Sequence, residues 1–235
     1  MENIFISNQG LTMKIIDFVH PNKGKVIFEN GYVVIAEMSN IRKGKVKNLL
    51  HPTMLNIGYI GVGKYNSCIN RKMTKPYKTW ASMFKRCYNY SPSGKYNSYD
   101  GCSVIPIWHN FQNFAKWFEE NYIEGFHLDK DILVKGNKVY SPDNCCFVPN
   151  EINNLFRCME FKNNNLPVGV YPYKLTNRFK AKIGIDNGKH EYIGIFETVK
   201  DAKTAYDNRK RIEIVNKAEK YKNLISEKCY LAMIR

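Results

Sequence analysis

Apolar and polar residues alternate in three short runs near the start of the chain. The runs cover residues 13–19, 25–29 and 32–36. A period of two is typical of strands that bury one face, and the intervening segments, Pro21-Asn22-Lys23-Gly24 and Glu29-Asn30-Gly31, consist of turn-forming residues. Asn-Gly between two such runs is a strong hairpin signal. The pattern predicts a small antiparallel β-barrel over residues 1–62.

Two amphipathic helices are predicted further along the chain, after a linker. Residues 61–76 are rich in Gly, Asn and Lys and show no period, which predicts the linker. Trp80, Met83, Phe84 and Cys87 then follow the i, i+3, i+4, i+7 spacing of a helix with one apolar face. Similarly spaced apolar residues predict a second helix, and they are Trp108, Phe111, Phe114, Ala115 and Phe118. We expect these aromatic side chains to form a core.

An acidic segment follows the second helix. Its pattern predicts a strand over 127–134, a turn at Gly136-Asn137, a second strand over 138–140 and a helix that begins near Pro149. Side chains alternate between the two faces of a strand. We therefore expect His127, Asp129 and Asp131 to share one face and Lys130 to point the other way.

The pattern changes again from Leu166 onward. Three strands are predicted, beginning at Gly169, Arg178 and His190 and separated by turns at 176–177 and 186–188. Thr198 is placed to cap a following helix. That helix carries Ala202, Ala205, Tyr206 and Arg209 at helical spacing, and a helical tail is predicted over 216–235. Asn163-Asn164-Asn165 marks the predicted domain boundary, and the whole chain is expected to be an α+β protein.

The charge of the chain favours a polyanionic partner. There are 36 Lys and Arg against 21 Asp and Glu, for a net charge of +15. Residues 1–75 carry 11 basic and 4 acidic side chains, residues 76–159 carry 9 and 8, and residues 160–235 carry 16 and 9. The excess lies in the two flanks, and the middle holds the clustered carboxylates. Flanks that grip nucleic acid around a site with metal-binding chemistry would have this distribution.

The cysteines and the N-terminus indicate a cytoplasmic protein. The seven cysteines are odd in number, include no C-x-x-C pair and have two adjacent members, Cys145 and Cys146. This usage fits neither a disulfide framework nor a zinc ribbon. The N-terminal residues have no basic segment followed by a long apolar run, and no stretch approaches the length of a membrane span. We expect no membrane association.

The middle of the chain, about residues 76–158, resembles the phage-borne branch of the HNH nuclease family. The matching blocks are Leu128-Asp129-Lys130-Asp131, then Tyr140-Ser141-Pro142-Asp143-Asn144-Cys145, then Asn153, with Trp80, Arg86 and Trp108 upstream. The resemblance implies a ββα unit over 76–160 that holds one divalent metal, Mg²⁺ or another divalent cation. It also implies double-stranded DNA as the substrate.

The resemblance also implies roles for individual residues. Asp129 matches the first metal ligand, Asn153 or Asn154 the ligand on the helix, and Asn144 the central Asn that ties the loop together. Lys130 stands where most members have the general-base His. A Lys with an ordinary pKa of about 10.4 is a poor base at neutral pH. His127 could take over that role if it shares a face with Asp129 and Asp131, or the site could be degenerate.

Residues 166–235 resemble a DNA-binding domain of the Apetala/ethylene-response-factor type. The matching residues are Gly169-Val170, Arg178 to Ile183, Tyr192 to Phe196, and Ala202 with Ala205-Tyr206-Asp207. The resemblance implies a three-stranded sheet that lies in the DNA major groove, with a helix on its back. This chain has Lys and Gly where plant members carry more Arg, so the recognised bases cannot be carried over.

Candidate DNA contacts come from the sheet and from the N-terminal region. A period of two places Phe179, Ala181, Ile183, Ile193 and Ile195 inward. The outward candidates are Tyr171, Tyr173, Arg178, Lys180, Lys182, His190 and Tyr192. The N-terminal candidates are Arg42, Lys43, Lys45 and Lys47, for which a solvated loop is an equally good interpretation.

Two functions remain open at this point. The first is an endonuclease of the phage homing type that cleaves or nicks double-stranded DNA with a divalent metal, and Asp129, Asn144 and Asn153 favour it. The second is a DNA-binding protein without cleavage, a regulator or architectural factor, and Lys130 favours that alternative.

Overall fold

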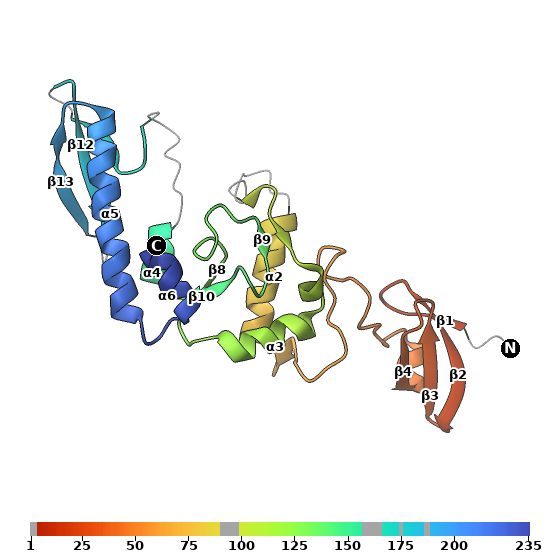
Figure 1. Cartoon of the computed structure of the whole chain (residues 1–235). Helices are drawn as coiled ribbons and strands as arrows, with labels where there is room; N and C mark the ends of the chain where they lie inside the picture. The colour runs from red at the N-terminus through yellow and green to blue at the C-terminus, as the bar shows by residue number, and fades with distance from the viewer. Residues whose placement is uncertain (1–3, 90–98, 157–165, 174–175, 186–188) are drawn as a thin grey trace. The chain divides into compact units, whose positions relative to one another are not determined.

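The computed structural model describes residues 4–89, 99–156, 166–173, 176–185 and 189–235. It is an α+β protein, as predicted, with several small sheets and helices (Figure 1). The chain divides into two compact units, Met1–Tyr96 with Pro106–Lys116, and Asn97–Ile105 with Trp117–Arg235. No helix in the described part of the chain is long and apolar enough to cross a membrane.

The N-terminal sheet is open, so the predicted barrel is wrong. Its antiparallel strands follow the order of the chain: β1 (Ile4–Ile6), β2 (Thr12–His20), β3 (Lys23–Phe28) and β4 (Val33–Glu37). Within the described residues, β1 and β4 do not pair with each other. One face of the sheet is covered by the short helix α1 (Met38–Arg42) and the segment after it, which bury Ile41 and Val46 against Met13 and Val26. Because α1 and the segment after it cover the apolar face, the sheet buries that face without closing into a barrel.

The predicted linker contains a short hairpin. Strands β5 (Cys68–Ile69) and β6 (Lys72–Met73) pair antiparallel around Asn70 and Arg71, whose φ angles are 48° and 61°. Both residues lie in the left-handed region of backbone space, which glycine usually occupies. The absence of glycine from this turn hid the hairpin from the sequence pattern.

The predicted aromatic core of the next helices is confirmed. Helix α2 (Lys75–Tyr88), the 3-10 turn η2 (Pro106–His109) and the first turns of α3 (Phe111–Asn121) bury their aromatic side chains together. The indole nitrogen of Trp80 donates a hydrogen bond of 2.7 Å to the carbonyl of Trp108. The ring of Trp80 also lies 4.7 Å from that of Phe84, between centroids. These rings therefore form a core.

The acidic segment folds differently from the prediction. Strand β8 (His127–Asp129) ends at Asp129 because the side chain of that residue turns the chain. The predicted second strand is β9 (Val139–Tyr140), but it pairs in parallel with β7 (Ser103–Val104). The antiparallel partner of β8 is β10 (Cys146–Val148), which is buried along its whole length and so shows no alternation. Helix α4 (Asn150–Phe156) follows and contacts β8.

The predicted C-terminal strands and helix are present. The strands β11 (Val170–Tyr173), β12 (Arg178–Gly184) and β13 (His190–Phe196) form an antiparallel sheet in that order, and α5 (Val199–Tyr221) lies against it. Thr198 caps α5, since its hydroxyl accepts a hydrogen bond from the amide of Asp201 at 3.1 Å. The predicted turn at 186–188 and the predicted boundary at 163–165 lie outside the described residues.

A bulge in β13 overturns one prediction on this sheet. Lys182 pairs with Tyr192 and Ala181 with Gly194, so Ile193 is an extra residue on its strand. An extra residue reverses the alternation beyond it. Ile195 therefore pairs with Lys180 on the outward face and is 37% exposed, instead of lying inward as predicted.

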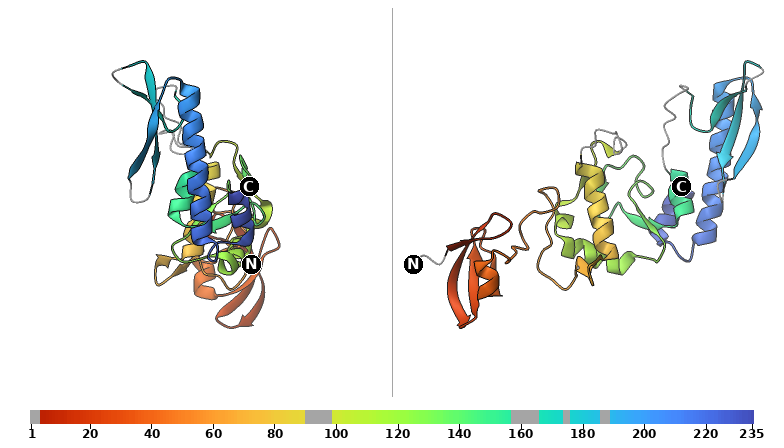
Figure 2. Two further views of the ribbon diagram at one scale, coloured as in Figure 1. Left: turned by 60° about the vertical axis from the view of Figure 1, so that its left-hand side comes forward. Right: turned by 180° about the vertical axis from the view of Figure 1, so that it is seen from behind.

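Helix α5 extends beyond the sheet and completes a second core. Its first half buries Ala202 and Tyr206 against the sheet. Its second half and α6 (Glu227–Ile234) bury Ala218, Cys229 and Met233 with side chains of the segment around β8, β10 and α4. Figures 1 and 2 show α5 running along β12 and β13 and on to α4 and α6. The predicted tail is thus part of the core under the acidic segment.

Candidate metal site and nucleic-acid interface

Asp129 is the carboxylate that shapes the acidic segment. Its side chain is buried at the end of β8. One oxygen, Oδ1, accepts hydrogen bonds from the backbone amides of Asp131 at 2.7 Å and Ile132 at 2.8 Å. These bonds close a tight turn, a conformation that Asp favours. The predicted strand over 127–134 stops here for that reason.

The second oxygen of Asp129 has no hydrogen-bond partner. Oδ2 forms no hydrogen bond with the described residues, and among them no fully buried side-chain oxygen lacks a partner. Oδ2 is therefore not completely buried. Burial raises the pKa of Asp129 above its ordinary value, and the two backbone hydrogen bonds offset this in part. A cation at Oδ2 would favour the charged form of this carboxyl.

Lys130 is a buried ammonium group held by its neighbours. Its Nζ donates hydrogen bonds to Asp131 Oδ1 at 2.6 Å and to the carbonyl of Asn137 at 2.8 Å. Burial lowers the pKa of Lys130, but the hydrogen bond and charge of Asp131 outweigh burial and raise that pKa above its ordinary value. The predicted separation of Lys130 and Asp131 on opposite faces is wrong, because the strand ends before them.

Asn144 and Asn137 join the two ends of the loop between β8 and β10. Asn144 donates from Nδ2 to Asn137 Oδ1 at 3.1 Å. Asn137 in turn donates to the carbonyls of Lys130 and Val139, both at 2.8 Å. Asn144 is thus linked through Asn137 to the backbone that follows β8. The sequence pattern identified Asn137 only as a turn residue.

The remaining candidates lie around Asp129 on neighbouring elements. His127 is exposed at the start of β8, two residues before Asp129 on the same strand. Asn153 is half-buried and Asn154 exposed on α4, and the side chains of both form no hydrogen bond with the described residues. Because α4 contacts β8, the helix that carries these amides adjoins the strand that carries the carboxylate.

This donor set suits one kind of cation. In the described part of the chain no three or more His, Cys, Asp and Glu side chains gather at a metal-binding distance. The neighbouring thiol of Cys145 stays protonated, since burial raises its pKa to about 12. What remains is a carboxylate oxygen with amide oxygens, which are ligands of hard cations such as Mg²⁺. By type, these oxygen donors suit a divalent cation such as Mg²⁺.

The outward face of the C-terminal sheet collects the predicted DNA contacts. Cross-strand pairs share a face, and the pairs here are Tyr171 with Lys180, Tyr173 with Arg178, and Lys182 with Tyr192. The Nζ of Lys182 lies 4.5 Å from the ring centroid of Tyr171. His190 is exposed at the start of β13. All seven predicted residues therefore lie on the side opposite α5.

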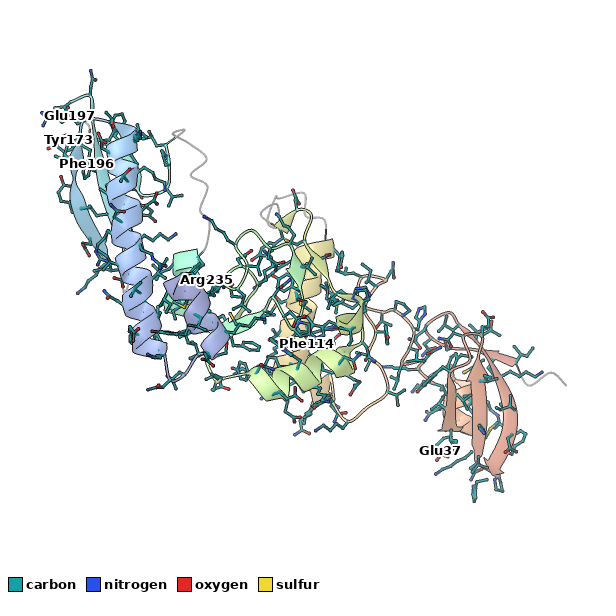
Figure 3. All side chains as sticks on the ribbon, viewed as in Figure 1. Glu37, Phe114, Tyr173, Phe196, Glu197 and Arg235 are labelled. Carbon is teal, nitrogen blue, oxygen red and sulfur yellow. The ribbon has the colours of Figure 1, made fainter. Side chains whose placement is uncertain are left out.

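Ion pairs brace this sheet. Arg178 lies 2.9 Å from Glu197, and Figure 3 labels Glu197 beside Tyr173 and Phe196 at one end of the sheet. Arg209 on α5 binds the Glu191 carboxylate through two nitrogens, at 2.8 and 2.6 Å. That interaction lowers the pKa of Glu191. The inner face is thus tied to the helix, while the other cations stay on the outer face.

The N-terminal candidates belong to a longer cationic stretch. Arg42, Lys43, Lys45 and Lys47 are exposed on and after α1 and form no ion pair with the described residues. Residues 38–99 include no Asp or Glu and twelve Lys and Arg. Charge counts over long windows hide this extent, because the acidic residues before position 38 are averaged with it.

The comparisons with known proteins give no match: no family model, no curated protein and no solved structure resembles this chain at a significant level. Any function therefore rests on the residues and geometry above.

Proposed function

We propose that this protein is a DNA-binding endonuclease of the homing type that cleaves or nicks double-stranded DNA with Mg²⁺ or another divalent cation. The observation that supports it most is the state of Asp129. Its carboxylate is buried, one oxygen accepts the two hydrogen bonds that form the chain turn, and the other forms no hydrogen bond with the described residues. A buried carboxylate is costly without a partner cation, so the site calls for one.

In this proposal Asp129 Oδ2 and the amide oxygens of Asn153 or Asn154 hold the cation. A bound divalent cation would stabilise the negative charge that develops on the oxygens of the cleaved phosphodiester. Asn144 and Asn137 keep the loop in place around it. Some site residues would thus bind the cation, and others would hold the loop that surrounds it.

His127 is the proposed general base. It is exposed on the same strand as Asp129 and is therefore accessible to DNA and water. Imidazole accepts a proton at neutral pH with little cost. Lys130 is assigned a structural role instead, because its raised pKa keeps it protonated and its ammonium is already engaged by Asp131 and Asn137.

DNA is held by the two cationic flanks in this proposal. The outward face of the C-terminal sheet carries cations and aromatic rings of the kind that contact phosphates and base edges. The cations around Arg42 to Lys47 add phosphate contacts without sequence preference. The enzyme would act in the cytoplasm of the cell whose DNA it binds.

Sequence-specific DNA binding without cleavage is the second candidate. Two observations favour it: no group of three or more His, Cys, Asp and Glu side chains gathers for metal binding among the described residues, and Lys130 stands where most of the nucleases that this segment resembles have a His. Such a protein would use the same sheet and the same cations. The two candidates differ only in whether the Asp129 site is active.

One pair of assays separates the candidates. Duplex DNA is titrated with protein at rising salt in EDTA, and supercoiled plasmid is incubated with protein and Mg²⁺ or Mn²⁺. The endonuclease predicts binding that weakens steeply with salt and nicked or linear plasmid with metal. Binding with intact plasmid in both metals would establish the second candidate. Affinity that hardly changes with salt would contradict both.

A further inference from the structure

One aliphatic side chain lies among the cations and rings on the outward face of the C-terminal sheet. Ile195 on β13 is 37% exposed and pairs with Lys180 on β12. Lys180 also pairs with Tyr171 on β11, so these three side chains form a row across the sheet. Among the described residues of the three strands, no other aliphatic side chain shares this face. The proposed function uses the cations and the rings of this face but gives Ile195 no role.

A bulge in β13 turns Ile195 to this face. From Tyr192, strict alternation would place residue 195 on the side of α5, but the extra residue Ile193 reverses the alternation. The strand is held by packing on the inner side, where Ile193 and Phe196 contact the core. A Cβ on Gly194 would lie 3.2 Å from the ring of Phe196, so the glycine leaves room for that ring. The packing of its neighbours therefore holds Ile195 outward.

The major groove of duplex DNA offers one apolar group to a side chain of this kind. The groove admits a β-ribbon, and a Lys side chain in it can bind the O6 and N7 atoms of guanine. The 5-methyl group of thymine lies on the base edges in this groove, and the minor groove exposes only polar atoms of the bases. An aliphatic side chain on a cationic sheet face that contacts base edges therefore has thymine as its complement.

The spacing of the row suits neighbouring base pairs. The Cβ atoms of a cross-strand pair such as Lys180 and Ile195 lie about 4.5–5.5 Å apart, and base pairs follow one another at about 3.4 Å. The two side chains can therefore contact bases one or two pairs apart. Glu197 lies two residues beyond Ile195, but Arg178 pairs with it at 2.9 Å and so reduces its repulsion of phosphates.

We propose that Ile195 contacts the 5-methyl group of a thymine in the major groove, one or two base pairs from the base that Lys180 contacts. The protein would thus select sites that have thymine at this place. The inference rests on the proposed DNA binding by this sheet and adds the base that one residue selects. Burying one methyl group changes affinity by about fourfold, which is the size of the effect expected here.

Uracil in place of thymine tests this contact directly, because it removes the methyl group and keeps the base pair. A preferred duplex is selected from a random pool with full-length protein in EDTA, and each of its thymines is then replaced singly by deoxyuridine. The wild type should bind about fourfold more weakly with uracil at one or a few positions. Ile195→Ala should bind the parent duplex more weakly and lose the discrimination at one of these positions. Ile195→Val, which keeps a β-branched side chain, should retain part of it.

Ile212→Ala is the matched control, because Ile212 on α5 is 54% exposed and loses the same atoms. This control should keep both the affinity and the discrimination of the wild type. The thymine contact is overturned, and DNA binding stands, if the wild type tolerates uracil at every position or if folded Ile195→Ala protein still discriminates. A preferred duplex that contains no thymine would also overturn the contact. If the wild type binds no duplex at all, the proposed function fails as well.

Discussion

At the scale of single residues, Asp129 explains most of the candidate site. The acidic pattern Leu128-Asp129-Lys130-Asp131 that contains it was visible in the sequence, and the resemblance of this pattern suggested Asp129 as a metal ligand. Its turn-forming hydrogen bonds were not visible. They depend on where the strand ends, which alternation alone does not fix. The same turn brings Lys130 to Asp131, a contact that a continuous strand would forbid.

The raised pKa of Asp129 predicts how stability varies with pH. The folded protein binds this proton more tightly than the unfolded chain, so the contribution of Asp129 to the free energy of unfolding falls as pH rises from the ordinary pKa through the raised one. Asp129→Asn should remove that fall while keeping an oxygen for the turn. Mg²⁺ or Mn²⁺ should offset it in the wild type alone. Urea unfolding across pH 3 to 7, with and without metal, measures the fall in stability and its offset by the metal. An identical pH dependence in wild type and variant would contradict the raised pKa of Asp129.

Lys130→Met should lower the free energy of unfolding. It should not remove the general base, because that role is proposed for His127. The variant leaves Asp131 and the carbonyl of Asn137 without their buried donor, which costs about 1–3 kcal/mol. Urea unfolding of this variant against Lys135→Met, an exposed residue of the same loop, measures the cost. If Lys130 were the base instead, the variant would lose cleavage in the presence of metal while remaining folded.

At the scale of elements, the sequence predicted those strands and helices whose apolar residues recur with a regular period. The N-terminal strands, both aromatic helices and the C-terminal sheet were predicted near their observed places. The failures have local causes: β10 is buried on both faces, the β5–β6 turn has no glycine, and the bulge at Ile193 turns Ile195 outward. The open N-terminal sheet was missed because the cover from Ile41 and Val46 is a tertiary contact.

The outward face of the C-terminal sheet should carry specific DNA affinity. Lys180→Ala with Lys182→Ala should weaken binding to a preferred duplex by about 1–3 kcal/mol if either makes a base contact. The fold should persist, since Ala181 and Ile183 remain buried. The control Lys200→Ala with Lys222→Ala removes the same charge from the two ends of α5, since Lys222 directly follows the helix. Titrations on preferred and random duplexes measure the difference, and equal effects of the two double variants would mean that this face does not read sequence.

At the scale of the molecule, α5 connects the reading sheet to the core under Asp129. Arg209 on α5 binds Glu191 of the sheet. Two residues later, Arg211 donates a hydrogen bond to the carbonyl of Met233 on α6, which belongs to the core under the acidic segment. Lys217, Lys220 and Tyr221 all bind the single carboxylate of Glu151 on α4. Because both sets of contacts lie on one continuous helix, the sheet and the candidate metal site have a fixed spacing. The sequence could not show this, since α4 and α5 are far apart in the chain.

That fixed spacing predicts a shift in the cleavage position. Inserting Ala-Ala-Lys-Glu-Ala-Ala-Arg between Arg209 and Lys210 adds about 10 Å of helix and nearly two full turns, and it keeps a Glu four residues after Arg209 and an Arg four residues before Glu213. The cut should move by about three base pairs from the bound sequence, at ~3.4 Å per pair. A seven-residue Gly-Ser insert should scatter the cuts instead. Sequencing of the cut ends measures both, and an unmoved cut with the helical insert would contradict the coupling.

The most direct test of the whole account is single-turnover cleavage by the wild type and by Asp129→Asn on the same duplex. Both proteins are first shown to bind it equally in EDTA, and Mg²⁺ or Mn²⁺ is then added. We expect metal-dependent strand cleavage by the wild type and a loss of about 10²-fold or more in the variant, with DNA affinity unchanged. Cleavage of equal rate in both proteins, or none in the wild type, would contradict the central claim that Asp129 holds the catalytic cation.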